Sequence, residues 1–535
     1  RMALSDHLRT ARTLAESGVL APVRPDRLVR VGAVLAKYGT TPAAAFPAIA
    51  ARHPDRLAIV DERGALSFAE LDRRANALAH ALAAGGIGAG DGIAIMCRNH
   101  RGFVEATAAA GKLGATALYL NTSFAGPQIT DVVEREAPKA VVYDEEFDGL
   151  VRDAARSRQR FVAWRDPGEA TDPAVPTLDD LIAAGDPSAP PAPAEPGRMV
   201  ILTSGTTGTP KGANRGTPSG LATVASLLSR IPFKAGGTTV VAAPMFHSWG
   251  FANTLASVVM GRTVVTRRKF DPEATLALLA RHRADALAVV PVMLQRILDL
   301  GPELIGRYDH HALKIIALSG SALSGQLAAE AMDVFGEVAY NLYGSTEVAW
   351  ATIATPEDLR AAPGTVGRPP AGTVVRLYTE DDRPVPEGGT GRIFVGNEML
   401  FEGYTGGGGK AVIDGLMATG DVGHFDAAGR LFVDGRDDDM IVSGGENVFP
   451  QEVEELLASL PEVADVAVIG VDDDEFGQRL SAYVVKRPKA KLSKDDVKRH
   501  VKAHLARYKV PRDVTFVDEL PRTATGKVLK RELRD

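Results

Sequence analysis

The chain of 535 residues contains a single cysteine, Cys97, which excludes an intramolecular disulfide framework and any metal site built from several cysteines. Cys97 ends the apolar run 93–97, where we expect it to be packed and inert. No continuous apolar stretch is long enough to span a bilayer, and the chain does not open with a basic segment followed by an apolar core. We therefore expect a protein that is neither integral nor exported, and that resides in the cytoplasm.

The sequence also lacks an excess of positive charge. Its net charge of −6 gives no electrostatic reason to bind nucleic acid, and its 45% hydrophobic and 24% charged residues are typical of globular proteins. A length of 535 residues exceeds the size at which one core keeps growing. We therefore expect two or more domains and no nucleic-acid partner.

Residues 1–40 differ from the rest of the chain because they carry seven basic and three acidic side chains. Leu4, Leu8, Ala11 and Leu14 have helical spacing, which predicts a basic amphipathic helix. Such a helix is suited to rest on a membrane surface and equally suited to pack on the main body. Both interpretations stay open, and we treat residues 1–40 as an N-terminal extension.

Strand-like and helix-like segments alternate from Phe46 onward. Such alternation predicts parallel crossovers and an α/β domain whose sheet is covered by helices. The expected strands are 58–60, 65–68, 92–97, 116–120, 238–242, 263–266 and 286–290, and the expected helices are 69–84, 102–113 and 272–282. Residues 167–196 contain eight prolines and are expected to form an irregular surface excursion.

The pattern changes twice toward the C-terminus. Short alternating runs at 374–378 and 391–395, separated by Pro and Gly, predict a β-rich subdomain. A small α+β domain follows, with expected helices at 450–457 and 493–505 and expected strands at 463–471 and 480–485. We expect residues 41–437 to form the large domain and residues 438–535 to form the small one.

The strongest local signal follows the apolar residues 199–202. It is the run Thr203, Ser204, Gly205, Thr206, Thr207, Gly208, Thr209, Pro210, Lys211 and Gly212. A buried strand that ends in a loop of hydroxyls and glycines suits phosphate binding by backbone N–H groups. The common P-loop pattern does not apply, because two residues separate Gly208 from Lys211. The run resembles the phosphate loop of the adenylate-forming enzymes, which include acyl-CoA synthetases, luciferases and adenylation domains.

This resemblance extends over residues 46–533 through an ordered set of motifs, several of which follow expected strands, where ligands collect in open α/β sheets. It implies that residues 203–211 hold the β- and γ-phosphates of ATP and that Tyr343 packs on adenine. It also implies that Thr346 contacts the α-phosphate and that Glu347 binds Mg²⁺, for which a carboxylate is a hard oxygen ligand. Further residues expected around the nucleotide are Gly320, Ser321, Ala322, Asn341 and Gly344.

The resemblance assigns the ribose and the catalytic cation to later positions. Asp421 is expected to accept hydrogen bonds from both ribose hydroxyls, and Arg436 is expected to reach the ribose. The run 521–527 resembles the loop that carries the adenylation lysine, although Ala524 stands where proline is common. Lys527 is expected to bridge the substrate carboxylate and the α-phosphate, because a cation stabilises two anions that are brought together.

A second half-reaction requires a thiol at the same carbonyl. In the resembled family the small domain rotates after adenylation, and Asp438 matches its hinge position. Gly445 matches the position at which a side chain would obstruct the pantetheine arm of coenzyme A.

The identity of the acid rests on the turn at residues 244–250. Domains that load α-amino acids have an aspartate where this chain has His247, so an uncharged acyl or aryl acid is favoured. The turn resembles that of fatty acyl-CoA synthetases, in which the histidine lies beside the adenylate. His247 is also interpretable as a hydrogen-bonded core histidine. The expected acyl pocket consists of Phe246, Trp249, Gly250 and Phe251.

We therefore expect an ATP-dependent fatty acid–CoA ligase of medium or long chain preference that uses ATP, Mg²⁺ and coenzyme A. An aryl-CoA ligase and an enzyme that loads an acyl carrier protein are the alternatives. A nucleotide-binding module without activity is disfavoured, because Glu347, Asp421 and Lys527 are all present. A homodimer and peripheral membrane contact through residues 1–40 stay open.

Overall fold

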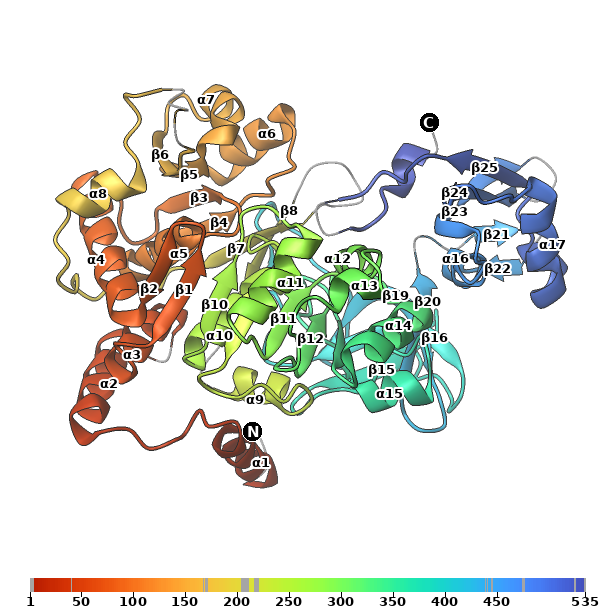
Figure 1. Ribbon diagram of the computed structural model, residues 1–535, viewed down its shortest axis with the longest axis horizontal. Helices are drawn as coiled ribbons and strands as arrows, with labels where there is room; N and C mark the ends of the chain where they lie inside the picture. Colours follow the sequence, from red (N-terminus) through yellow and green to blue (C-terminus); the bar gives the residue numbers. More distant parts are fainter. Residues whose placement is uncertain are drawn as a thin grey trace.

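The computed structural model of the protein describes residues 4–39, 41–166, 168, 172–203, 211–215, 221–437, 439, 441–443, 446–473, 477–523 and 526–533. Figure 1 shows a large body and, set to one side of it, a smaller unit made of the C-terminal residues. Within these residues, no helix is both long enough and apolar enough to cross a membrane.

An eight-stranded sheet forms one half of the large body, in the order β14-β13-β12-β11-β9-β10-β1-β2. Its inner strands are parallel, whereas the pairs β1–β2 and β13–β14 are antiparallel. Apolar side chains fill both faces of the inner strands, which is typical of a parallel sheet between helices. The strands are β1 (Leu57–Asp61), β2 (Gly64–Ser67), β9 (Thr238–Val241), β10 (Thr263–Thr266), β11 (Ala286–Val289), β12 (Ile315–Leu318), β13 (Ala339–Tyr343) and β14 (Thr352–Ala354).

A seven-stranded sheet forms the other half, in the order β17-β8-β7-β4-β3-β5-β6. The strands are β3 (Gly92–Met96), β4 (Thr116–Tyr119), β5 (Ala140–Asp144), β6 (Gln159–Trp164), β7 (Met199–Thr203), β8 (Lys211–Arg215) and β17 (Gly403–Tyr404). The predicted α/β fold is confirmed. The strands are divided between two sheets, which the alternation of segments did not reveal.

Helices connect and cover the two sheets. Those of the main body are α3 (Pro42–Arg52), α4 (Phe68–Ala84), α5 (Arg101–Leu113), α6 (Gly126–Glu136), α7 (Asp148–Ala154), α8 (Leu178–Ala184), α9 (Ala222–Leu228), α10 (Ser248–Val259), α11 (Pro272–Arg281), α12 (Pro291–Leu298), α13 (Pro302–Ile305), α14 (Gly325–Phe335) and α15 (Pro356–Ala361). Helix α4 begins at a capping box, in which Ser67 and Glu70 each accept a hydrogen bond from the other's backbone N–H. Helix α10 contacts α3 and strands β9, β10 and β11, so it lies in the interior of the body.

The interpretation of residues 167–196 as wholly irregular is wrong. Helix α8 is capped by Thr177, whose side chain accepts from the N–H of Asp180 in a capping box. Leu178 is buried there and belongs to the same apolar core as α4. Two side-chain hydrogen bonds and one buried leucine therefore order a short helix within a proline-rich segment.

The β-rich subdomain is a five-stranded sheet in the order β15-β16-β19-β18, with β20 beside β19. Its strands are β15 (Val374–Tyr378), β16 (Thr390–Gly396), β18 (Val412–Ile413), β19 (Leu416–Phe425) and β20 (Leu431–Arg436). The C-terminal unit has its own apolar core. It contains β21 (Ile441–Ser443), β22 (Glu446–Val448), α16 (Pro450–Ala458), β23 (Val463–Asp473), β24 (Gly477–Lys486), α17 (Lys494–His504) and β25 (Asp513–Val517).

The N-terminal extension contains two helices, α1 (Leu4–Glu16) and α2 (Pro25–Tyr38). Helix α1 contacts α9, and Leu14 is buried in the main core, so this helix packs on the body. Helix α2 packs on α3 through the side that buries Tyr38. Elsewhere on this helix, Leu28, Val29 and Leu35 are exposed to solvent, at 62%, 73% and 39%.

The buried polar group around Cys97 has a structural role. Cys97, His100 and Asp144 offer ligand atoms within 4.8 Å of one another. His100 however uses both ring nitrogens: Nδ1 accepts the N–H of Gly102 at the start of α5, and Nε2 lies 2.7 Å from Asp144 Oδ1. Burial raises the pKa of Cys97 well above its ordinary value, so the thiol stays protonated. This group caps a helix and leaves His100 without a lone pair for a metal ion.

Candidate active site

The expected turns meet at one edge of the eight-stranded sheet. Strands β9, β11, β12 and β13 are parallel neighbours, so their carboxyl ends lie side by side. The prediction that these turns lie together at strand ends is confirmed. The turns concerned are 244–250 after β9, 319–322 after β12 and 343–347 at the end of β13.

Asp421 on β19 is the first of two carboxylates that face this edge. The Tyr343 hydroxyl donates to Asp421 Oδ2 at 2.5 Å, and Arg436, its register partner on β20, lies 3.9 Å from Oδ1. Burial raises the pKa of Asp421, while the Tyr343 hydroxyl and the charges of Arg436, Lys527 and Lys410 act against this rise. Residues from the large body and from the C-terminal unit thus act on one carboxylate.

Glu347 is the second carboxylate. Tyr404 on β17 donates to its Oε1 at 2.7 Å. Burial favours the protonated form, but hydrogen bonds involving Tyr404 and Ser345, together with the charge of Lys410, outweigh it and lower the pKa of Glu347. Glu347 is therefore ionised at neutral pH and has a second oxygen with which to bind a cation.

Two residues that flank the hydroxyl- and glycine-rich loop belong to the same site. Thr203 ends β7 and pairs with Lys211, the first residue of β8. The Lys211 Nζ lies 5.3 Å from the centroid of the Tyr404 ring, which is within range of a cation–π contact. Tyr404 thus links the end of the loop to Glu347.

The side chain of Asn341 is suited to a ligand that offers a hydrogen-bond donor. Asn341 is only 4% exposed, and its Oδ1 has no hydrogen-bond partner in the described part of the chain. The neighbouring backbone is tightly fitted, because a Cβ at Gly344 would lie 2.1 Å from the carbonyl oxygen of Ala349. Gly320 has φ +95°, which turns the chain from β12 toward Ser321 and Ala322. A buried acceptor without a partner is costly unless a ligand pairs with it.

The turn after β9 contacts the turn after β13 and carries an uncharged imidazole. Ser248 Oγ and Thr346 Oγ1 are 3.2 Å apart, which joins the start of α10 to the turn after β13. His247 precedes α10, and burial lowers its pKa to about 4. Its ring lies 4.6 Å from that of Phe246, and its Nε2 is buried without a partner in the part of the chain that the structure describes. His247 is therefore neutral at pH 7.

The expected acyl-pocket residues lie on the first turn of α10, with different neighbours. Trp249 is buried and donates from Nε1 to the carbonyl of Val289 at 3.1 Å. Phe251 faces the other sheet, and its ring centroid is 4.9 Å from that of Tyr119. Gly250 has a packing role, because a Cβ there would lie 2.2 Å from the Pro244 carbonyl oxygen.

The lysine of the C-terminal run reaches the same site. A hairpin holds Lys527, whose backbone N–H donates to Thr523 Oγ1 at 3.1 Å. Gly526 in this hairpin has φ +82°, and a Cβ there would lie 2.4 Å from Val292 Cγ1 on α12. Burial raises the pKa of Asp421, and the charge of Lys527 acts against this rise. The C-terminal unit is thus docked with Lys527 facing the nucleotide-binding edge.

Some expected residues lie outside the described part of the chain. These are Ser204, Gly205, Thr206, Thr207 and Gly208 of the phosphate loop, Asp438 at the expected hinge and Gly445.

Comparison with known proteins decides the family. Residues 46–405 match the family model for the AMP-binding enzyme, and residues 452–527 match the model for the AMP-binding enzyme C-terminal domain. This chain belongs to the AMP-binding enzymes. It is a member of the adenylate-forming superfamily and an AMP-forming acid–thiol ligase.

The AMP-binding enzymes most similar to it differ in the acid they use. A feruloyl-CoA synthase from Amycolatopsis sp is 32% identical over 88% of this chain and 94% of its own length. The long-chain-fatty-acid–CoA ligase FadD13 from Mycobacterium tuberculosis is 30% identical over 88% of this chain and 93% of its own. The solved o-succinylbenzoate CoA synthetase from Bacillus subtilis, bound to its acyl-adenylate, has a TM-score of 0.81 at 26% identity, and the match covers 92% of this chain and 98% of that one.

The site residues of this AMP-binding enzyme fit a magnesium nucleotide. The buried Asn341 Oδ1 matches the amino group of adenine, which is a donor. Asp421 and Arg436 offer an acceptor and a donor for ribose hydroxyls. The ionised Glu347 provides the hard oxygen that Mg²⁺ prefers.

Sequence reasoning missed two residues of this site. Tyr404 binds Glu347, although 56 residues separate them in the chain and only the pairing of β17 with β8 brings them together. Lys410 follows four glycines, at 406–409, and its charge acts on both Glu347 and Asp421. The unusual glycine run was the one local signal that could have drawn attention to Lys410.

Proposed function

We propose that this enzyme is a fatty acid–CoA ligase with a medium or long chain preference. In the first half-reaction a carboxylate oxygen attacks the α-phosphorus of ATP, and the bond to pyrophosphate breaks. In the second the coenzyme A thiol loses its proton and attacks the acyl carbonyl, and AMP leaves. Overall, one acid, one ATP and one thiol give one thioester, AMP and pyrophosphate.

Each site residue has a proposed role in these steps. Lys527 bridges the two anions of the first half-reaction, Thr346 holds the α-phosphate, and Asp421 with Arg436 orients the ribose. Bound at Glu347, Mg²⁺ would neutralise charge on the phosphate oxygens. Residues 438–535 form the mobile domain, with Asp438 as its hinge and Gly445 beside the incoming thiol.

The observation that carries the fatty acid assignment is that the side chains at the start of α10 are all uncharged. Phe246, Trp249 and Phe251 are apolar, and burial keeps His247 neutral above about pH 4. These side chains offer no charge to pair with an ammonium or a second carboxylate. The binding free energy of an acyl chain improves by roughly 0.8 kcal/mol for each methylene that these side chains remove from water.

A profile of acyl-CoA formation against straight-chain acids from C2 to C18, with benzoate, tests this assignment. We expect kcat/KM to rise from acetate through octanoate or beyond, and we expect benzoate to be poor. A benzoate optimum would support the aryl-CoA alternative, to which the similarity to feruloyl-CoA synthase also points. Substitution of an acyl carrier protein for coenzyme A in the same assay addresses the carrier-loading alternative.

We also propose that helix α2 contacts an anionic membrane surface. Its solvent side is apolar and carries Leu28, Val29 and Leu35 together with small residues. Exposed Arg24, Arg30 and Lys37 flank this side. Arg24 and Arg30 share the carboxylate of Asp26, so the flank keeps an excess of positive charge, as expected for a helix that lies in a lipid headgroup layer.

A further inference from the structure

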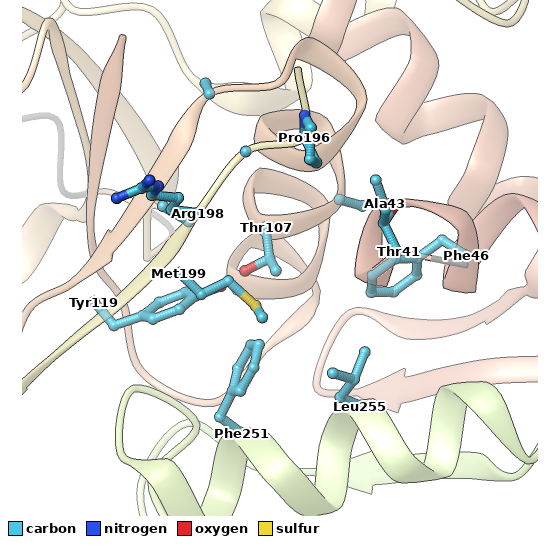
Figure 2. Close-up of a pocket in the computed structure, with 15 residues that line it drawn as sticks. Thr41, Ala43, Phe46, Thr107, Tyr119, Pro196, Arg198, Met199, Phe251 and Leu255 are labelled. Atoms are coloured by element: carbon cyan, nitrogen blue, oxygen red, sulfur yellow. The ribbon is translucent and has the colours of Figure 1, made fainter. Parts of the chain in front are cut away.

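An apolar cavity lies behind Phe251, on the side of α10 that faces the seven-stranded sheet. Its free volume is about 40 Å³. Figure 2 shows the side chains around it, which come from α3, α5, α10, β4 and β7. The side chains that matter for the argument are Thr41, Thr107, Tyr119, Met199, Phe251 and Leu255.

The cavity adjoins the proposed acyl site. Phe251 lines it and stands one helical turn from His247, which precedes α10 beside the Ser248–Thr346 contact. Leu255 lines it one turn further along the same helix. An acid that extended from the adenylate along this side of α10 would meet Phe251 first and then this cavity.

One wall of this apolar cavity contains a hydroxyl that has no partner. Tyr119 at the end of β4 is 1% exposed, and its Oη forms no hydrogen bond of good geometry in the described part of the chain, although the Thr107 hydroxyl lies near enough to act on it. Its ring is held in place, because its centroid lies 4.9 Å from that of Phe251 and 5.2 Å from that of Phe103. A buried hydroxyl without a partner destabilises a protein, and a ligand oxygen that bonds to it would recover that free energy.

Thr107 adds a second hydroxyl to the same cavity. It donates to the Phe103 carbonyl at 2.8 Å, which leaves its oxygen able to accept. Burial raises the pKa of Tyr119, and the Thr107 hydroxyl acts against this rise. Tyr119 thus offers a proton and Thr107 offers a lone pair. The charged residue on the cavity lining is Arg198, which is 60% exposed and lies 4.0 Å from Glu402.

We propose that Tyr119 and Thr107 form a polar subsite for an oxygen at the far end of the acid. The preferred substrates are acids whose hydrocarbon part ends in a hydroxyl or a keto group. A hydroxyl satisfies both residues, since it accepts from Tyr119 and donates to Thr107, whereas a keto oxygen satisfies Tyr119 alone. A second carboxylate is not favoured, because the interior of the cavity offers it no cation. This inference rests on the proposed function and narrows its substrate class.

Pairs of acids matched in size test the proposal. We would compare each ω-hydroxy acid from C6 to C12 with the straight-chain acid one carbon longer. We would also compare 4-hydroxycinnamate with 4-methylcinnamate, so that the alkyl and aryl arms separate chain shape from the terminal oxygen. In at least one arm, we expect the oxygenated acid to exceed its partner in kcat/KM by about tenfold.

Tyr119→Phe should abolish this preference. It keeps the ring, so we expect kcat/KM to fall about tenfold for the oxygenated acid and to stay within about twofold for the hydrocarbon partner. Tyr38→Phe is the matched control, because Tyr38 also buries a hydroxyl without a partner but does not line the cavity. Thr107→Val should weaken the preference for the hydroxy acid, and the kcat/KM of an ω-keto acid of the same length, added to the alkyl arm, should stay unchanged.

The outcomes distinguish this inference from the function on which it rests. If the wild-type protein forms acyl-CoA but treats both members of every pair alike, the subsite proposal is overturned and the ligase assignment stands. Equal losses for both members in Tyr119→Phe would also overturn it, since they indicate a purely structural role. If no acid supports pyrophosphate release, the ligase assignment itself fails.

Discussion

At the scale of single residues, two half-buried carboxylates that each accept from a tyrosine have pKa values shifted in opposite directions. Asp421 accepts from Tyr343 and its pKa is raised by burial, whereas Glu347 accepts from Tyr404 and its pKa is lowered despite burial. The difference suits their proposed tasks. A metal ligand must be ionised, while an acceptor for ribose hydroxyls depends on its position more than on full charge.

Lys527→Ala should abolish adenylation but leave thioester formation from supplied acyl-AMP largely intact. The lysine faces the site in the arrangement described here, and we propose that it is withdrawn in the second half-reaction. Acid-dependent pyrophosphate release and CoA consumption from acyl-AMP measure the two steps. Lys530→Ala is the control, because Lys530 pairs with Glu454 at 2.9 Å within the C-terminal unit. Equal loss of both steps in Lys527→Ala would contradict the assigned role.

His247 should make the folded protein less stable in mild acid. Its pKa is lowered from 6.5 to about 4, so below pH 6.5 the unfolded chain binds a proton that the folded chain refuses until about pH 4. Stability from this group is complete above pH 6.5 and falls as the pH drops toward 4, by about 2 kcal/mol after allowance for partial exposure. Denaturant unfolding of wild type and His247→Gln at pH 7 and pH 4.5 measures the difference. The same pH dependence in both proteins would mean that the imidazole does not titrate in this way.

At the scale of elements, the two N-terminal helices have different roles. Helix α1 buries Leu14 against the body, which agrees with the packed interpretation of the extension. Helix α2 keeps its apolar side in solvent. The predicted pattern at residues 4–14 thus belongs to the helix that packs, and α2, which that pattern did not predict, is the helix with an exposed apolar side.

Leu28→Glu combined with Val29→Glu should abolish binding to vesicles that contain an anionic lipid. Each side chain is largely exposed, so the change removes apolar area from the membrane contact without opening the core. Vesicle flotation should show at least a tenfold loss of bound protein. Leu150→Glu combined with Val374→Glu is the control, since these exposed apolar residues lie elsewhere. A concentration-dependent dimer that the α2 variant disrupts would instead assign the face to a second copy of the chain.

Local pattern predicted elements far better than it predicted their partners. The strand at 263–266 matches β10 because buried parallel strands read as short apolar runs between turns. Helix α8 was missed because its capping box lies among prolines. The contact of Tyr404 with Glu347 depends on the pairing of β17 with β8, and no spacing along the chain contains that information.

At the scale of the whole molecule, Gly526 of the C-terminal unit packs against Val292 on α12 of the large body. Gly526→Ala should slow adenylation at least tenfold, because the new methyl group would lie 2.4 Å from Val292 Cγ1. Transfer from supplied acyl-AMP should persist. Gly429→Ala controls for backbone strain, since Gly429 has φ +73° and no atom within 4 Å of its added Cβ. Val292→Ala should partly restore Gly526→Ala, and failure to do so would mean that backbone strain alone explains the loss.

The burial of Cys97 has a practical consequence for measuring the proposed rotation of the C-terminal unit. Its thiol is fully buried and protonated, so the native chain already behaves as a protein without a reactive cysteine. One cysteine introduced on α17 and another on α15 would be the two sites that a fluorophore reagent labels. Energy transfer between the two dyes would then test whether the C-terminal unit rotates during turnover, with Cys97 left in place.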